Sequence, residues 1–299
     1  MTTTFAWTID DAGMGGERMI ESVGRTASLL ESRGVRATWF VVPRPGGEPL
    51  PEPWRAALLG ARERGHDLQL HGLTHEDCYE FGPPNWPATD ILPSLGPEFE
   101  RRRAELSPRY TRERLRGRIA EGIERFERAF GARPSVFRAP CGAISRPMFE
   151  ALADLGLRYH SCCYVSGTGY DHLPHRQRTV RHAWADTYPH RPFRWYAGVV
   201  EAPILNEWTW AGARRQQVAM LDAARADLDR IRAESPVAVL LSHTHGIADD
   251  FEHAFAVVDA VLEHLDRSGD RRFETLGELA ASGDLDRAAT VDGPDLLTI

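Results

Sequence analysis

Short apolar runs alternate with longer amphipathic segments along almost the whole chain. Apolar runs of about four to eight residues are typical of strands buried in a parallel sheet, and the segments between them carry apolar residues at helical spacing. The expected strands cover residues 4–9, 37–42, 67–70, 135–138, 157–161, 198–205, 237–242 and 272–274. The expected helices cover residues 16–33, 53–64, 111–130, 146–155, 213–232 and 251–267. This alternation predicts β/α units that form a parallel sheet.

Seven or eight such units predict an α/β barrel, which carries its chemistry on the loops after the strand ends. Two regions interrupt the alternation. Residues 76–109 are rich in Pro, Gly and aromatic residues and are too long for an ordinary connection, so we expect a folded insertion. Residues 165–196 lack a clear period and are expected to be irregular. We expect one catalytic domain over residues 1–285 and a C-terminal tail over residues 286–299.

The composition allows one globular domain and argues against two kinds of partner, nucleic acid and a membrane. Of the 299 residues, 42% are hydrophobic, which is enough for a full core. The net charge of −7 arises from interspersed acids and bases, so nucleic acid is not an expected partner. No apolar run reaches the ~18–20 residues needed to cross a bilayer, and residues 1–10 are expected to form a strand rather than a signal peptide. A membrane is therefore not an expected partner either.

The cysteines and the basic residues bear on the compartment and the chemistry. Cys78, Cys141, Cys162 and Cys163 have the spacing of neither a zinc ribbon nor a disulfide framework, which favours a reducing cytoplasm. All 36 basic residues are Arg, which excludes Schiff-base chemistry on Lys.

Two strand ends carry candidate metal ligands. Asp10 and Asp11 end the first strand, where one carboxylate can bind a metal while the other acts as a base; a simple turn or helix cap would use the same residues. His71 and His75 follow the third strand and can face one ion if this segment turns helically, although unrelated surface histidines often have this spacing. Together, two His and one carboxylate form a common catalytic metal set with open positions for water.

Arg138-Ala139-Pro140-Cys141-Gly142 closes the fourth strand. Its Pro and Gly predict a rigid turn whose N–H groups can face an oxyanion, and Arg138 can hold a carboxylate in a bidentate contact. A plain turn from strand to helix is the alternative. Cys141 is not expected to be a nucleophile, because nothing near it in the sequence would activate it.

His243 and His245 follow the strongly apolar strand 237–242. A His whose pKa lies near neutrality can protonate a leaving amine, so His243 is the natural general acid. His245 competes for this role, and either ring can instead bind a metal or simply end the strand.

Read in chain order, these four motifs resemble those of the polysaccharide deacetylase family, the NodB-homology or carbohydrate esterase 4 group. Residues 8–12, Thr-Ile-Asp-Asp-Ala, are similar to its Thr-Phe-Asp-Asp-Gly motif, and residues 71–75, His-Gly-Leu-Thr-His, to its His-Ser/Thr-x-x-His motif. Residues 138–142 are similar to Arg-x-Pro-aromatic-Gly, and Leu241-Ser242-His243 to Leu-x-His. The resemblance implies a distorted (β/α)7–8 barrel in which Asp11, His71 and His75 bind one divalent ion.

The resemblance also implies catalytic roles. Asp10 would be the general base for water, Arg138 its orienting partner and His243 the general acid, while the N–H of Cys141 would share the oxyanion with the metal. Zinc is the expected ion, although two His and a carboxylate also suit Co, Fe, Ni or Mn.

Three positions depart from the family pattern: Ala12 replaces Gly, Gly72 replaces Ser or Thr, and Cys141 replaces an aromatic residue that often lines a sugar groove. These departures argue against a polysaccharide substrate. Residues 159–163 and 201–204 look more similar to the branch that acts on small molecules, which includes allantoinase-like enzymes and the deformylase of 4-amino-arabinose lipid modification.

The family's fourth motif, Asp-x-Asp-Trp, is not recognised, so the carboxylate that orients His243 is left open between Asp171 and Glu201. The insertion at 76–109 is expected to form a wall or lid over the metal, with its aromatic residues against the substrate. The expected substrate contacts are Tyr79, Trp86, Glu201 and Trp208.

The function that agrees best with these motifs is metal-dependent hydrolysis of an N-acyl group, acetyl or formyl, from an amino sugar or a similar small-molecule amine. A cyclic amide or ureide hydrolase would use the same residues. A catalytically silent sugar-binding module is a third possibility, but such a module has no need for Asp10 and His243 beside a complete ligand set. The oligomeric state is not predicted.

Overall fold

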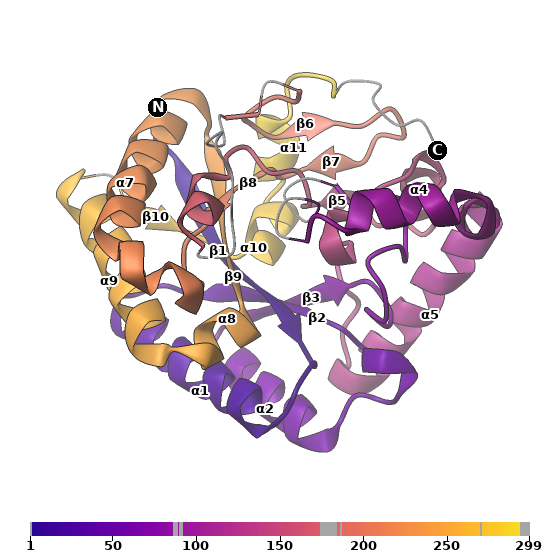
Figure 1. The fold of residues 1–299 in the computed structure, drawn as a ribbon, viewed down its shortest axis with the longest axis horizontal. Helices are drawn as coiled ribbons and strands as arrows, with labels where there is room; N and C mark the ends of the chain where they lie inside the picture. The colour runs from indigo at the N-terminus through magenta and orange to yellow at the C-terminus, as the bar shows by residue number, and fades with distance from the viewer. Residues whose placement is uncertain are drawn as a thin grey trace.

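The centre of the molecule is a sheet of mainly parallel strands (Figure 1). The computed structural model describes residues 2–85, 89, 92–173, 184–185, 187–269 and 271–293. Within these ranges ten strands form one sheet in the order β6-β7-β5-β4-β3-β2-β1-β9-β8, and β10 also pairs with β1. The strands are β1 (Thr4–Ala12), β2 (Ala37–Val41), β3 (Asp67–His71), β4 (Val136–Arg138), β5 (Tyr159–His160), β6 (Phe193–Arg194), β7 (Val200–Glu201), β8 (Ile204–Glu207), β9 (Val237–His243) and β10 (Arg272–Phe273).

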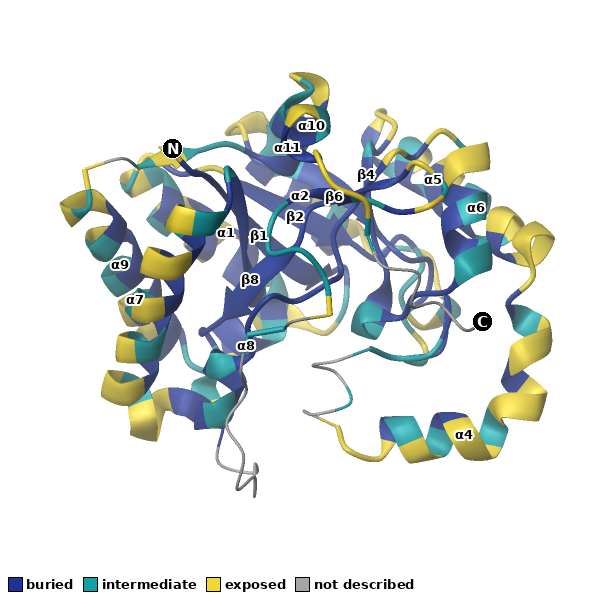
Figure 2. Cartoon of the chain, turned by 90° about the horizontal axis from the view of Figure 1, so that it is seen from above, coloured by how far each residue is buried: buried dark blue, intermediate teal, exposed yellow. Residues whose placement is uncertain are grey.

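Helices cover the outside of this curled sheet, which confirms the predicted single-domain α/β fold of the distorted-barrel type. The α-helices are α1 (Glu17–Ser32), α2 (Glu52–Glu63), α4 (Leu95–Leu106), α5 (Arg112–Phe130), α6 (Arg146–Asp154), α7 (Gln217–Glu234), α8 (Thr244–Asp249), α9 (Phe251–Arg267), α10 (Leu276–Ala281) and α11 (Asp284–Ala288). Figure 2 shows buried residues on the sheet and exposed residues on the outer faces of the helices. In both views α7 and α9 lie at one end of the sheet, and α4 and α5 lie at the other.

The first strand, β1, is an inner strand of the sheet with three neighbouring strands. β1 pairs in parallel with β2, β9 and β10, and all nine of its residues are buried. A strand that is covered on both faces carries a nearly continuous apolar run, as residues 4–9 do. Because parallel strands end at the same edge of a sheet, β1, β3, β4 and β9 bring their terminal motifs to one side of the molecule.

Local signals set helix ends close to the predicted positions. Thr111 precedes α5 and accepts a hydrogen bond from the N–H of Arg114, and Gly131 ends the helix at φ 67°. Thr275 and Glu278 form a capping box at the start of α10. These signals depend only on neighbouring residues, so they can be recognised in the sequence.

The predicted strand 198–205 is wrong as one element, because it is two strands at different places in the sheet. β7 pairs with β5, whereas β8 pairs with β9 at the other edge. Ala202 and Pro203 separate them. Proline has no N–H to donate to a ladder, so it interrupts an inner strand.

The two regions without clear periodicity contain regular structure. The predicted insertion at 76–109 includes α4, and its aromatic residues pack on each other: the ring of Phe99 lies 6.0 Å from that of Tyr79 and 6.4 Å from that of Tyr110. The expected irregular region 165–196 includes a 3₁₀ turn, η4 (Thr168–His172), and the strand β6.

The described part of the expected tail is packed, since Asp286 accepts a hydrogen bond from Tyr159 at 2.5 Å. Among the described residues, no helix is both long and apolar enough to cross a membrane.

Candidate active site

The four predicted motifs meet at one cavity. Asp10 and Asp11 lie near the end of β1, His71 ends β3, Arg138 ends β4 and His243 ends β9. All five side chains line a cavity of about 220 Å³. The fold therefore gathers residues that are far apart in the sequence into one site.

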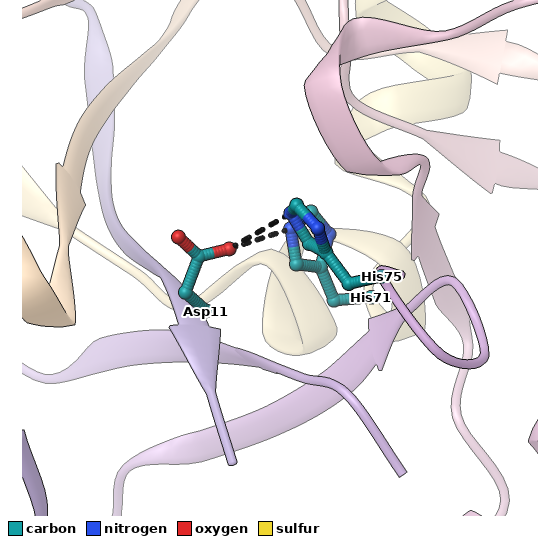
Figure 3. Close-up of side chains that lie close together, drawn as sticks. All are labelled: Asp11, His71 and His75. Carbon is teal, nitrogen blue, oxygen red and sulfur yellow. Dashed lines mark ion pairs between the residues drawn. The ribbon is translucent and has the colours of Figure 1, made fainter. Parts of the chain in front are cut away.

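Asp11, His71 and His75 face one another in the cavity (Figure 3). The Oδ1 atom of Asp11 lies 3.3 Å from Nε2 of His71 and 3.2 Å from Nε2 of His75. Two ligand atoms that are each about 2.1 Å from one ion lie about 3.0–3.4 Å apart at ordinary coordination angles. The observed separations therefore fit a group of ligands that could hold a divalent metal ion.

Two further observations support this fit. Asp11 Oδ1 is buried, and no described residue donates a hydrogen bond of good geometry to it. A buried carboxylate oxygen without a donor is costly unless a cation is its partner. The Nδ1–H of His71 donates to the backbone oxygen of Arg138 at 3.0 Å, which leaves the lone pair of Nε2 directed at Asp11.

Strained backbone positions occur at this site. Asp11, His75 and Cys141 are the non-glycine residues with positive φ in the described chain, at 63°, 52° and 54°. Such conformations are uncommon for residues with a Cβ and cluster at functional sites. All three residues line the cavity.

Glu80 fixes the loop that carries His75. Its carboxylate accepts hydrogen bonds from the backbone N–H groups of Leu73, Thr74 and His75, at 3.0–3.1 Å. Arg118 donates to the same carboxylate at 2.8 Å. The loop is thus wrapped around a buried anion, a role that the sequence analysis missed because nothing in the spacing of Glu80 indicates it.

The charges in the site depend on one another. Burial raises the pKa of Asp11, but His75, His245 and His71 outweigh this effect and hold its pKa well below the usual value. Burial lowers the pKa of His75, but Asp11 more than compensates and the pKa of His75 is raised. His245, which follows β9, lies 3.1 Å from the second oxygen of Asp11 through its Nδ1. The Asp11 carboxylate is therefore surrounded by three imidazoles.

Asp10 is paired with the buried Arg138. Arg138 donates to Oδ1 of Asp10 at 2.7 Å, and its other N–H groups donate to Thr8 and to Ser161. The second oxygen of Asp10, Oδ2, lies 4.0 Å from Nε2 of His71. Arg138 thus keeps one oxygen of Asp10 occupied while the other lies beside the candidate ligands.

His243 is held by Glu207, a residue that the sequence analysis missed. The Nδ1–H of His243 donates to both carboxylate oxygens at 2.9 Å, and Tyr170 donates to Glu207 Oε2 at 3.0 Å. Burial lowers the pKa of His243, but the carboxylate of Glu207 raises it to about 10. The recognisable signal was Glu207-Trp208, which matches the end of the family's Asp-x-Asp-Trp motif with Glu in place of Asp.

The expected partners of His243 were wrong. Glu201 is fully buried and accepts hydrogen bonds from Nδ1 of His160 at 2.5 Å and from the N–H groups of Cys162 and Cys163. It does not line the cavity, so the structure does not place it among the substrate contacts either. Asp171 lies in η4.

Two other expected substrate contacts, Tyr79 and Trp208, also lie elsewhere. Tyr79 is 2% exposed and donates to the backbone oxygen of Leu95, and Trp208 is 3% exposed; neither lines the cavity. Trp86 lies outside the described residues. The aromatic residues that do line the cavity include Tyr164, Tyr170 and Trp210, and the ring centre of Trp210 is 5.1 Å from that of His243. Tyr79 and Trp208 are core side chains. The sequence did not reveal this, because apolar area alone does not distinguish a core side chain from a substrate contact.

The expectation of four reduced cysteines is also wrong. Cys78 and Cys141 form a disulfide that joins the loop after His75 to the turn after Arg138, while Cys162 and Cys163 are free and buried. The cysteines therefore do not support a reducing compartment. The two cysteines are 63 positions apart in the sequence, and such a pairing cannot be deduced from spacing alone.

A mainly parallel α/β sheet with a cavity that gathers ionisable side chains at the carboxyl ends of its strands is the architecture of an α/β enzyme. The sequence model of the polysaccharide deacetylase family matches residues 3–160, just over half of the chain. The chain therefore belongs to the polysaccharide deacetylase family. A search of curated proteins finds no match.

Solved structures show the same fold. The structure is similar to a protein from Mycobacterium smegmatis assigned as a polysaccharide deacetylase, with TM-score 0.64 and 17% identity over 100% of this chain and 95% of that one. It is also similar to a family 4 acetyl xylan esterase from Clostridium thermocellum in complex with a cobalt ion, with TM-score 0.51 and 14% identity over 99% and 100% of the two chains. A mutant of a family 4 pseudoenzyme has TM-score 0.50 and 14% identity over 93% and 67%.

Proposed function

We propose that this protein is a metal-dependent hydrolase that removes an N-acyl group, acetyl or formyl, from a small-molecule amine. The observation that carries the proposal is the buried Oδ1 of Asp11, which faces Nε2 of His71 and of His75 and lacks a hydrogen-bond donor of good geometry among the described residues. The family relation supports a deacetylase, and the cavity size supports a small substrate.

Asp11, His71 and His75 would hold the ion, with zinc as the proposed occupant. When bound, a divalent ion polarises an amide carbonyl and makes water more acidic. Two His and one carboxylate leave coordination positions open, as a catalytic rather than a structural site requires.

Asp10 acts as the general base in this proposal. Its Oδ2 lies beside the candidate ligands, so it can take a proton from the attacking water, while Arg138 holds Oδ1 and keeps the carboxylate oriented. The backbone N–H of Cys141, in the turn after β4, is the proposed donor to the oxyanion.

His243 acts as the general acid. Its Nδ1–H is engaged by Glu207, so Nε2 is the atom that can reach the cavity. A pKa raised to about 10 keeps the ring protonated at neutral pH, and a protonated ring can donate to the leaving nitrogen. An amide nitrogen needs this proton, because an unprotonated amide ion is a very poor leaving group.

The direct test measures metal and product together. Protein purified without chelator is analysed for metal, and acetate and formate release is measured from a panel of N-acyl amines in the wild type and in Asp10→Asn. We expect bound metal in both proteins and turnover about 10²- to 10⁴-fold lower in the variant. A wild type that binds metal and ligands but releases no acid would identify a silent binding module instead.

A further inference from the structure

We infer that the amine part of the substrate is a compact, uncharged and mostly apolar group, such as an aromatic or alicyclic ring, rather than a sugar. This inference rests on the proposed function and concerns the same cavity. It follows from the size of the cavity, from the polar groups of its wall and from the residues around His243.

The size of the cavity suits one ring. Its volume is about 220 Å³. An apolar cavity of about 150 Å³ holds a benzene ring, whereas sites for drug-sized ligands span about 300–1,000 Å³. A ring with a short acyl group fills the observed space, and a chain of sugars exceeds it.

The polar side chains of the described wall are engaged with each other. Arg138 is bonded to Asp10 and Ser161, and Tyr170 is bonded to Glu207 and lies 3.2 Å from the hydroxyl of Tyr164. A sugar ring presents several hydroxyls, and each one buried without a partner costs about 1–3 kcal/mol. A sugar would have to break these existing bonds or remain unsatisfied.

His245 also lines the cavity and has no assigned role in the reaction. Its side chain is 38% exposed, so its ring is accessible to a substrate. Its Nδ1 already faces Asp11, which leaves a single ring nitrogen for a substrate. One nitrogen cannot satisfy the several hydroxyls of a hexose. The described wall also offers no Lys, Asp or Glu beyond the catalytic carboxylates, so it does not suit a charged group.

The ring of the proposed general acid packs against an aromatic side chain. The leaving nitrogen must reach His243, so the group attached to it lies against the residues around that ring. These include Trp210, which packs on both His243 and His245; Ile204 and Leu92 are further apolar residues that line the cavity. Flat and branched apolar side chains favour an aromatic or alicyclic amine.

The test compares substrates on the metal-loaded full chain. Acetanilide and N-cyclohexylacetamide represent apolar amines, and N-acetylglucosamine and N,N′-diacetylchitobiose represent sugars. Because two or more unsatisfied hydroxyls cost several kcal/mol, we expect kcat/KM to be at least about 100-fold higher for the apolar amides. Equal or higher values for the sugars would overturn this inference and leave the proposed function intact. If metal is bound and no amide is hydrolysed, the proposed function fails and this inference fails with it.

A surface variant tests the wall itself. Leu92 lines the cavity but is 51% exposed, so Leu92→Asn is compatible with folding. We expect it to lower the ratio of acetanilide to acetamide turnover by about fivefold, because an apolar contact is lost. Val218→Thr is the matched control, since Val218 is 76% exposed on α7 and does not line the cavity. An unchanged ratio in Leu92→Asn would overturn the assignment of this wall to the amine.

Discussion

Glu207 holds His243 through both carboxylate oxygens, each 2.9 Å from Nδ1. Tyr170 donates to the same carboxylate, and Glu207 is fully buried. A buried anion with few other donors stabilises the protonated imidazole strongly. The protonation state of the proposed acid therefore depends on a residue that does not line the cavity.

Glu207→Gln tests this dependence. The amide keeps the size of the side chain but removes the charge, so the pKa of His243 falls and the ring loses its proton at lower pH. We expect kcat to fall by about 10²-fold or more and the alkaline limb of its pH profile to move to lower pH. The measurement is kcat from pH 6 to about 10.5, with metal content as a control. An alkaline limb in the same place would show that Glu207 does not set the pKa of the acid.

Asp11→Ala tests the proposed ligand set. Removal of one of three protein ligands leaves an ion poorly held, so we expect loss of both metal and activity. His71→Ala should behave in the same way, whereas Glu207→Gln should retain metal. Elemental analysis of the three variants after gel filtration checks this, and stoichiometric metal in Asp11→Ala would contradict the assignment.

The buried pair His160 and Glu201 should make stability depend on pH at both ends. Burial lowers the pKa of His160, but Glu201 raises it to about 10, so its contribution is complete below the unfolded value near 6.5 and is lost as the pH rises through 10. Burial raises the pKa of Glu201, but His160 lowers it to about 2, so its contribution is complete above about 4.5 and is lost as the pH falls through 2.

Glu201→Gln should therefore destabilise the protein most between about pH 4.5 and 6.5, by about 3–5 kcal/mol in the free energy of unfolding. The difference from wild type should shrink toward pH 10. Urea titrations at pH 5.5 and 9.5 measure it. The pair of His264 and Asp229, whose side chain is 58% exposed, provides the control, since Asp229→Asn should change stability by less than about 1 kcal/mol. An equal loss at both pH values would show that the Glu201 effect is steric rather than electrostatic.

The disulfide between Cys78 and Cys141 should be detectable chemically. Peptide mapping without reductant should recover these two residues linked, with Cys162 and Cys163 as free thiols. Cys78→Ser should lower the free energy of unfolding by about 2–4 kcal/mol, because a long loop of the unfolded chain is no longer closed. Recovery of four free thiols from protein purified in air would contradict the bond.

The sequence predicts the parts of this protein that depend on neighbouring residues. Apolar runs locate the inner strands, capping residues such as Thr111 locate helix ends, and the motif residues at strand ends meet because parallel strands share an edge. The failures involve contacts between distant segments. Glu207 reaches His243 across 36 positions, and only the Glu207-Trp208 pair indicates it in the sequence; Cys78 reaches Cys141 across 63 positions, and no local pattern reports this contact.

The substrate contacts show a different limit. Tyr79 looks suited to bind a ring, yet it lies in the small core of the insertion against Phe99. Trp208 and Trp210 are two positions apart, and only Trp210 lines the cavity. Alternation along the chain indicates which side chains share a face, but the identity of that face depends on the path of the whole chain.

The pairing of β1 with β9 has a consequence for the order in which the protein folds. In the parallel ladder between β1 and β9, Asp10 is the register partner of His243, and the hydroxyl of Thr244 donates to the backbone oxygen of Asp11 across 233 residues. Pairings of such high contact order form slowly. A nascent chain therefore carries the proposed base and metal ligands from early in synthesis, but the proposed acid joins them only when β9 docks on β1, so during refolding metal binding should precede the recovery of catalysis.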